Sequence, residues 1–214
     1  KELASLFGVS LITVRKALDD LASQGLIRRH AGRGTFIAKR KIEQGLTNFF
    51  SFFTCMQDKG IQVTTCIVEK GMIPFGRSIG AKLQMEKKSP IFRLIRIRMV
   101  EDEPILLETV YLPSHRFPQI EEVDFSEVSM YKVMEQKYGV QIYKASDYFE
   151  PVIINSYESE LLGVQVGSAA LLLERIACDP TGMPVEYSKG VFRGDRCRFS
   201  IDLTNPMLHR LKEE

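Results

Sequence analysis

Apolar positions repeat with two different periods along the chain, and the first period marks its beginning. Between residues 10 and 24 they recur every three or four positions, which is the spacing of one helix face. Ser10 stands before this stripe as a good N-cap, and Gly25 after it is a typical C-terminal stop. The pattern predicts a helix over residues 10–24 after a shorter helix, and together they form a helix–turn–helix. The stripe consists of Val14, Ala17, Leu18 and Leu21.

Two short segments with basic side chains follow the second helix. Residues 26–30 and 35–37 are predicted as strands, and the glycines between them favour a tight turn. A helix–turn–helix followed by a basic, glycine-tipped hairpin is typical of a winged helix. Its second helix enters the DNA major groove, and its wing lies along the backbone or the minor groove. We therefore expect DNA contacts from Ser10, Thr13, Arg15, Lys16, Arg33, Gly34 and Thr35.

From residue 61 onward, β-branched and alternating segments replace the helical period. Strands outnumber helices and most links are short, which predicts a mixed α+β domain with a mainly antiparallel sheet. We expect strands over residues 61–73, 91–100, 105–112, 143–154, 169–178, 185–192 and 197–203. We expect helices over residues 76–85, 129–138 and 156–162, the last capped by Ser156. Residues 103–108 and 183–187 resemble each other, which suggests an internal duplication of a hairpin.

Charge is distributed unevenly between the two parts. Residues 1–41 hold nine Lys and Arg against three acidic residues, a net charge of +6, whereas the other twenty basic and twenty-four acidic residues leave −4. A basic head on an acidic body indicates that only the head meets a polyanion, although a basic face can also be merely solvated. We assign residues 1–38 to a winged-helix domain, 39–48 to a linker, 49–204 to a second domain and 205–214 to a C-terminal tail.

Several functional classes find no support in the sequence. No apolar run approaches the ~20 residues of a membrane span. The four cysteines are scattered without a C-x-x-C pair, and only three histidines are present, which argues against structural zinc. The cysteines are typical of small buried hydrophobes in a reduced cytoplasm. We find no Ser-His-Asp spacing and no glycine-rich phosphate loop, and we expect no metal and no cofactor.

Two arginines of the strand at residues 91–100 are the first candidates for a binding site. Arg96 and Arg98 stand two positions apart, so their side chains share one face of the strand. Two adjacent guanidinium groups suit a phosphate or carboxylate, which they can bind bidentately. A solvated sheet face is the alternative, because arginine is mostly exposed.

Further candidates lie on the neighbouring strand, on a helix and in the second copy of the repeated motif. Glu108 and Glu186 could accept hydrogen bonds from hydroxyl or amino groups of a ligand. Ser129 and Tyr131 open a helix, where free N–H groups favour an anion, although Ser129 can also be a simple N-cap. Tyr187 is a weaker candidate. The expected effector-binding set is Arg96, Arg98, Glu108, Ser129, Tyr131, Glu186 and Tyr187.

The head resembles the DNA-binding domain of the GntR family of bacterial repressors. The resemblance rests on Val-Ser-x-x-Thr-Val-Arg-Lys-Ala-Leu at residues 9–18, Leu-x-x-x-Gly-Leu-Ile at 21–27 and Gly-Arg-Gly-Thr-Phe at 32–36. Leu11 stands where the family usually has an arginine, which bears on the operator sequence and not on the fold. The resemblance also implies a further helix before Lys1, so the winged helix here is expected to be truncated.

The second part resembles the UTRA effector-binding domain of the HutC branch of that family, which is similar in fold to chorismate lyase. The resemblance rests on residues 93–98, 103–108, 111–113, 182–187 and 192–199. It implies that the strand with Arg96 and Arg98 lines an effector pocket.

The resemblance therefore implies a cytoplasmic, homodimeric transcriptional repressor that binds operator DNA and a small anionic metabolite, with a sugar phosphate favoured over a carboxylate. The alternatives are an enzyme of chorismate-lyase-like fold that acts on a small anionic substrate, and a constitutive architectural DNA-binding protein. Fold alone does not decide between them.

Overall fold

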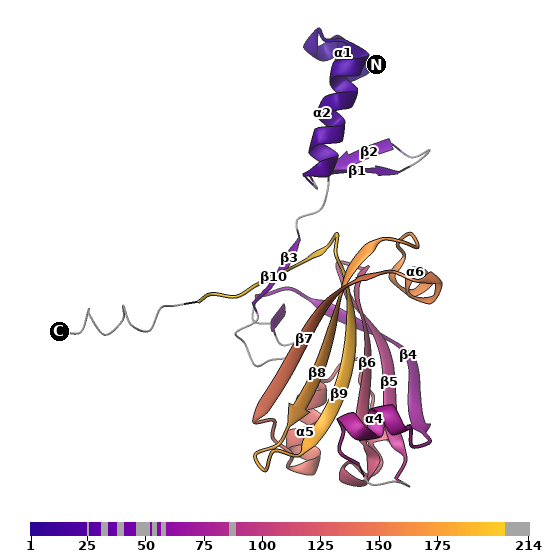
Figure 1. Cartoon of the computed structure of the whole chain (residues 1–214), viewed down its shortest axis with the longest axis vertical. Coiled ribbons are helices and arrows are strands. Elements are labelled where there is room, and N and C mark those ends of the chain that lie inside the picture. The colour runs from indigo at the N-terminus through magenta and orange to yellow at the C-terminus, as the bar shows by residue number, and fades with distance from the viewer. Residues whose placement is uncertain are drawn as a thin grey trace, which may run out of the picture. The chain divides into compact units, whose positions relative to one another are not determined.

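The computed structural model describes residues 1–24, 26–30, 34–37, 41–45, 52, 55–56, 59–85 and 89–203, with only the backbone at 28–30. The chain forms two compact units (Figure 1), which we call the head, Lys1–Lys41, and the body, Ile42–Glu214. Across the described part of the chain, no helix has the length and apolar character needed to span a bilayer.

The head contains the predicted helix–turn–helix and hairpin. Helix α1 (Glu2–Phe7) ends at a left-handed glycine, Gly8, and α2 (Leu11–Ser23) begins after Ser10, whose side chain accepts from the Thr13 N–H at 3.1 Å. Strands β1 (Ile27–His30) and β2 (Gly34–Ile37) pair antiparallel. The predicted stop at Gly25 and the turn at residues 31–33 lie outside the described residues.

The apolar stripe of α2 lies on the side of the helix that faces α1. Together with Leu3 and Phe7 of α1, it lines an apolar groove of about 310 Å³. No residue of either helix is buried. The helical period places Arg15 and Lys16 on the other side of α2, where they are exposed.

The body is built on a six-stranded sheet in which all neighbours run antiparallel, as the sequence predicted (Figure 1). The order is β4-β5-β6-β9-β8-β7. Its strands are β4 (Val63–Ile73), β5 (Ile91–Val100), β6 (Glu103–Pro113), β7 (Lys144–Ile153), β8 (Ala169–Cys178) and β9 (Pro184–Arg193). Its helices are α4 (Arg77–Lys82), α5 (Met130–Tyr138) and α6 (Ser156–Leu162), with short 3₁₀ turns η1 (Ser114–Arg116) and η2 (Ile120–Glu122).

The sheet consists of two halves with the same order of elements. One half runs β4-α4-β5-β6 and the other β7-α6-β8-β9, and the halves meet where β6 pairs with β9. If Pro104 is matched with Pro184, the β6–β9 register is symmetric about the pair Thr109–Lys189. Both inner hairpins carry a bulge next to the matched proline. The strand order thus supports the duplication that the sequence suggested.

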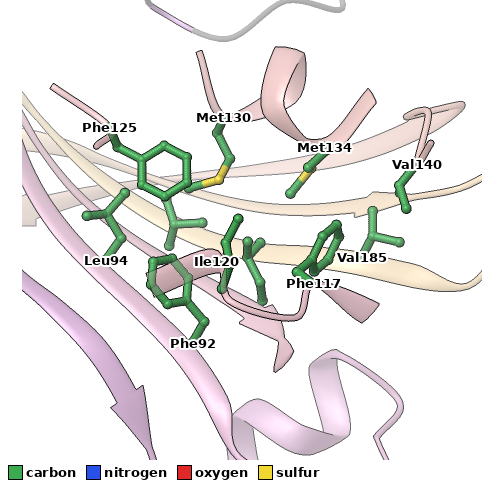
Figure 2. Packing of buried hydrophobic residues seen from close by; sticks show 11 residues of the cluster. Phe92, Leu94, Phe117, Ile120, Phe125, Met130, Met134, Val140 and Val185 are labelled. Carbon is green, nitrogen blue, oxygen red and sulfur yellow. The ribbon is translucent and has the colours of Figure 1, made fainter. Parts of the chain in front are cut away.

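Each face of the sheet has its own hydrophobic core. On one face, α5 packs Met130 and Met134 against Phe92 and Leu94 of β5, with Phe125 beside them (Figure 2). Helix α6 covers the other face, where Leu162 belongs to a cluster with residues of β5, β6, β8 and β9. Because successive side chains of a strand point to opposite faces, each position of β5 and β9 is committed to one of these cores.

A parallel pair of short strands stands apart from the sheet. Strand β3 (Ile42–Gly45) pairs with β10 (Cys197–Ser200), and Ile42 and Cys197 join a buried cluster with Leu106 and Phe192. The prediction of a linker over residues 39–48 is therefore wrong at Ile42–Gly45. The alternation of buried and exposed positions makes this segment a strand of the body.

Buried charges tie the start of β10 to the sheet. Arg193 pairs with Asp195 in the same turn (Nη2–Oδ2 3.0 Å) and with Glu103 at the start of β6 (Nη2–Oε1 2.9 Å). Arg196 lies beside the other oxygen of Glu103, with 3.1 Å between Nη1 and Oε2. This cluster fixes the place where the chain leaves β9 for β10.

Helix α6 has its predicted bounds, but its capping residue differs from the prediction by one position. The cap is Asn155 and not Ser156: Asn155 Oδ1 accepts from the Glu158 N–H, and Glu158 Oε2 accepts from the Asn155 N–H, each at 3.0 Å. This reciprocal pair is a capping box, and Asp, Asn and Ser are all good caps, so the sequence alone left the choice open.

We expect Asn155→Ala to lower the free energy of unfolding by about 1 kcal/mol, because two backbone N–H groups of α6 depend on the capping box. Urea unfolding followed by circular dichroism measures this difference. Ser156→Ala is the matched control and should change the value by less than about 0.5 kcal/mol. A larger loss for Ser156→Ala than for Asn155→Ala would contradict this assignment of the cap.

Candidate functional site

A partly open cavity of about 40 Å³ lies on the α5 face of the sheet between two apolar clusters. Its walls combine apolar side chains with a group of charged and polar side chains. The apolar and glycine residues are Phe52, Leu106, Met130, Leu173, Gly190 and Phe192. The polar residues are Gln44, Arg96, Glu108, Tyr131, Arg175, Glu186 and Ser188.

Two arginines, one from each half of the sheet, reach the cavity. Arg96 of β5 donates from Nε to Glu108 Oε2 at 2.6 Å. Arg175 of β8 binds Asp147 bidentately, with Nε–Oδ1 and Nη2–Oδ2 both 2.7 Å. Arg96 lies opposite Glu108, and Arg175 lies opposite Ser188, the position that matches Glu108 in the duplication. The two guanidinium groups are therefore related by the internal symmetry.

Each of these arginines is held in place by a carboxylate, yet one donor is left over. Arg96 Nη1 is buried and has no hydrogen-bond partner in the described structure. Paired with Asp147, Arg175 has a pKa above its ordinary value although burial acts to lower it. Arg175 thus stays positively charged at neutral pH, and Arg96 has a donor free for an anionic group.

Arg98 does not line the cavity. Its Nη1 donates to Thr65 Oγ1 at 2.5 Å, and its Nε stands 3.6 Å from Glu108 Oε2. Burial, with the nearby charge of Arg96, lowers the pKa of Arg98 to about 10. Arg98 therefore stabilises the ionised form of Glu108 without lining the cavity.

Glu108 and Glu186 sit in the same cavity with opposite electrostatics. Burial acts to raise the pKa of Glu108, but the charges of Arg96 and Arg98 outweigh it and hold this pKa below its usual value. Burial raises the pKa of Glu186, against the effects of Arg175 and of hydrogen bonds from Tyr131 and Ser188. The ionised form of Glu108 is thus favoured by its surroundings, whereas burial disfavours the ionised form of Glu186.

The environment of Glu186 leaves an acceptor open toward a ligand. Burial, with the nearby charge of Glu186, raises the pKa of Tyr131 well above its ordinary value, so its phenol stays protonated. One carboxylate oxygen, Glu186 Oε2, is buried without a hydrogen-bond partner. A hydroxyl or ammonium group of a ligand would satisfy this oxygen.

The structure brings some of the predicted effector residues together and leaves others out. Arg96, Glu108, Tyr131 and Glu186 line the cavity. Arg98 and Ser129 do not; Ser129 precedes α5 without a side-chain cap bond.

Tyr187 does not belong to the cavity, because strand alternation turns it to the opposite face from its neighbours Glu186 and Ser188. Its ring stacks on Tyr111 at 5.8 Å, and its hydroxyl donates to Glu174 at 3.0 Å. Tyr187 therefore lies outside the cavity that Glu186 and Ser188 line.

Sequence reasoning missed Arg175, Ser188 and Gln44. Arg175 follows Glu174 in an otherwise apolar run and lacks the two-residue spacing that drew attention to Arg96. The repeated motif held the missing signal: matching Pro104 with Pro184 pairs Glu108 with Ser188, and their cross-strand partners are Arg96 and Arg175. Gln44 lay in the predicted linker.

In the head, the predicted DNA-contacting residues that the structure describes are exposed. The hydroxyls of Ser10 and Thr13 bond each other at 2.8 Å, so both side chains take part in the helix cap. Arg33 lies outside the described residues. The exposed set is Ser10, Thr13, Arg15, Lys16, Gly34 and Thr35. Among the residues whose side chains are described, no group of three His, Cys, Asp or Glu could hold a metal ion.

Comparison with protein families matches both units. Residues 1–37 match the model of bacterial regulatory proteins of the gntR family, and residues 58–198 match the UTRA domain. The chain belongs to the GntR family of regulators with a UTRA domain. In this GntR regulator the cavity and the sheet that builds it fall within the UTRA match.

The relatives of this GntR regulator include transcriptional repressors. It is 33% identical to the HTH-type transcriptional repressor NagR of Bacillus subtilis (strain 168) over 93% of this chain and 82% of that protein. It is 25% identical to the probable fructoselysine utilization operon transcriptional repressor of Escherichia coli (strain K12), over 94% of this chain and 82% of that one. The crystal structure of PhnF from Mycobacterium smegmatis matches with a TM-score of 0.73 and 27% identity, over 95% and 89% of the two chains.

These comparisons decide the class of the protein. It is a DNA-binding transcriptional regulator, and its curated relatives are repressors and not enzymes. The alternative of an enzyme finds no support in them.

Neutralising the two cavity glutamates, Glu108 and Glu186, should change the free energy of unfolding in opposite directions. Glu186 has a raised pKa, so its ionised form costs stability above that pKa, and the cost disappears as the pH falls through it. We expect Glu186→Gln to raise the free energy of unfolding of the ligand-free protein at pH 8, with a smaller gain at pH 5. Urea unfolding at both pH values measures this.

Glu108→Gln is the matched comparison. Its lowered pKa means that ionised Glu108 stabilises the fold above its ordinary pKa, and this contribution is lost as the pH falls further. The substitution should cost about 3 kcal/mol at pH 8, because Arg96 loses its buried partner. Equal losses in both variants would contradict the electrostatic difference between the two sites.

Proposed function

We propose that a small anionic metabolite, a sugar phosphate in the first place, binds the cavity of this GntR regulator and controls its binding to operator DNA. The observation that carries the proposal is the unpartnered Arg96 Nη1 beside a second guanidinium, Arg175, in a cavity with open acceptors. The arginines suit a phosphate or carboxylate. Glu186 Oε2 suits a hydroxyl or amino group of the same ligand. A phosphorylated sugar or amino sugar offers both, and the fructoselysine repressor among the relatives is in keeping with a sugar-derived effector.

We propose further that two copies of the chain act as a homodimer in the cytoplasm on a pseudo-palindromic operator. The exposed Arg15 and Lys16 of α2 would face the major groove, and the β1–β2 hairpin would lie along the backbone or minor groove. The effector would act by binding one arrangement of the heads more tightly than another. Its influence on operator affinity cannot exceed that difference in affinity.

We expect phosphorylated sugars to raise the melting temperature of the protein, and their unphosphorylated parents to have little effect. A ligand at ~100 times its Kd adds about 2.7 kcal/mol, or roughly 5–11 °C for a chain of this size. In Arg175→Ala the shift at the same concentration should fall by half or more. Loss of charged hydrogen bonds worth about 1.5–3 kcal/mol weakens binding about 10- to 150-fold. Differential scanning fluorimetry with an external dye is suitable, because the chain has no tryptophan.

Arg93→Ala is the matched control for this experiment. Arg93 lies on the same strand as Arg96 but faces away from the cavity, where it pairs with Glu69. Its substitution should leave the ligand-induced shift unchanged. If no phosphorylated sugar and no small carboxylate shifted the melting temperature of the wild type, the anion site would be disproved.

Arg15 and Lys16 should play different roles on DNA. If Arg15 contacts guanine in the major groove, Arg15→Ala costs about 1–3 kcal/mol in operator affinity and relaxes the preference at that base pair. Lys16→Ala should weaken binding to all sequences alike and reduce its salt dependence, as expected of a phosphate contact. Fluorescence anisotropy with operator and non-operator DNA at several salt concentrations separates the two. Unchanged operator affinity in Arg15→Ala would exclude Arg15 from base recognition.

A further inference from the structure

The cavity receives one polar side chain from the segment that connects the head to the body. The body begins at Ile42, directly after the end of the head at Lys41, and its first residues form β3. Gln44 of β3 is only 7% exposed and lines the cavity. Its carbonyl oxygen, Oε1, is buried without a hydrogen-bond partner. A buried acceptor without a partner is costly, so a donor from a ligand would be favoured at this place.

Three polar atoms of the described cavity wall are buried without a hydrogen-bond partner, and they belong to different parts of the body. Arg96 Nη1 and Glu186 Oε2 stand on β5 and β9, which are inner strands of the six-stranded sheet. Gln44 Oε1 stands on β3, whose one partner among the described strands is the short β10. A ligand that satisfies the sheet atoms and Gln44 together would therefore bridge the sheet and the strand that continues from the head.

Strand β3 is held to the body by its short pairing with β10 and by Ile42, which is buried in the cluster with Leu106 and Phe192. The Ile42 N–H donates to the Arg196 carbonyl at 2.7 Å, and Gln44 lies opposite Phe199 in the parallel pair. The Glu43 carbonyl accepts a hydrogen bond from the Lys59 ammonium. A parallel pair of four residues is a weak anchor compared with the ten-residue strands of the sheet. A ligand bond to Gln44 would add to this short pairing.

The wall on which β3 rests is also part of the cavity. The ring of Phe192, which lines the cavity, packs edge-on against Phe199 at 4.9 Å and against Phe52 at 5.7 Å. Phe199 belongs to β10, the partner of β3. The position of the β3–β10 pair is therefore sensitive to how the cavity is filled.

We propose that Gln44 is the positioning residue that couples the cavity to the head. A hydroxyl or ammonium group of the bound anion donates to Gln44 Oε1, fixes β3 against the sheet and thereby restricts the direction in which the chain continues to the DNA-binding unit. This inference rests on the proposed function, since it requires an anionic effector in the same cavity. It also narrows the effector class to anions that carry a donor on the side facing Gln44.

The test compares the coupling between ligand and DNA in the wild type and in Gln44→Leu. Leucine keeps the size of the side chain and removes the acceptor oxygen. The probe is glucosamine 6-phosphate, followed by other phosphorylated sugars from the thermal-shift panel. Isothermal titration calorimetry gives its Kd with and without a DNA fragment that the wild type selects from a random pool. The ratio of the two Kd values is the coupling factor, which commonly lies between about 5 and 150.

We expect Gln44→Leu to bring this ratio below about 2 while the Kd without DNA changes by less than about tenfold. Glu43→Gln is the matched control. Glu43 precedes Gln44 and its side chain is exposed, so the ratio should stay at the wild-type value. The melting temperature of ligand-free Gln44→Leu should be no lower than that of the wild type, because an unpartnered acceptor is removed. A lower melting temperature would mean that Gln44 serves the fold.

Two failures are distinguishable. If the wild type binds the probe and the ratio in Gln44→Leu stays at the wild-type value, coupling through Gln44 is overturned, while the anion site stands. If the wild type binds none of the phosphorylated sugars, the proposed function fails for this class of ligand, and the inference fails with it.

Discussion

The architecture of the body depends on charge buried on one face of an antiparallel sheet. Arg96 and Arg98 lie almost fully inside the protein, where an isolated charge would be prohibitively costly. Glu108, on the adjacent strand, lies close enough to compensate both, at 2.6 and 3.6 Å. The sheet register that places Glu108 opposite Arg96 is therefore an electrostatic requirement as well as a consequence of backbone pairing. A slip of one residue would turn Glu108 to the other face and leave two buried cations without an anion.

The duplicated halves compensate their buried arginines in different ways, and this difference gives the cavity its charge distribution. In the first half, the inner strand β6 supplies the acid, whereas in the second half the outer strand β7 supplies Asp147 and leaves Ser188 at the position of Glu108. Glu186, which matches the apolar Leu106, then adds a carboxylate that no arginine neutralises directly. Symmetric backbone pairing thus holds an asymmetric set of charges, as recognition of an asymmetric small molecule requires.

Sequence patterns were sufficient for most of the elements and for part of the cavity. Strands β5 and β8 agree with their predicted bounds, because each is a mainly apolar run that is paired on both sides in the sheet. Gln44 escaped prediction for a physical reason: its segment is short and polar, and its burial comes from pairing with β10 near the other end of the chain. Ser129 and Tyr187 were included for their local motifs, and only the tertiary arrangement shows which way their neighbours face.

The division of labour among the cavity residues follows from how firmly each is anchored. Side chains on inner strands of the sheet, such as Arg96 and Glu186, stand on backbone that is paired on both sides, so a ligand gains orientation from them without moving them. A contact transmits information only where the protein has two arrangements of comparable free energy. Within the described part of the cavity wall, Gln44 is the polar residue whose strand has one short partner and continues to the head. On the proposal that Gln44 couples the cavity to the head, affinity and response are carried by different strands.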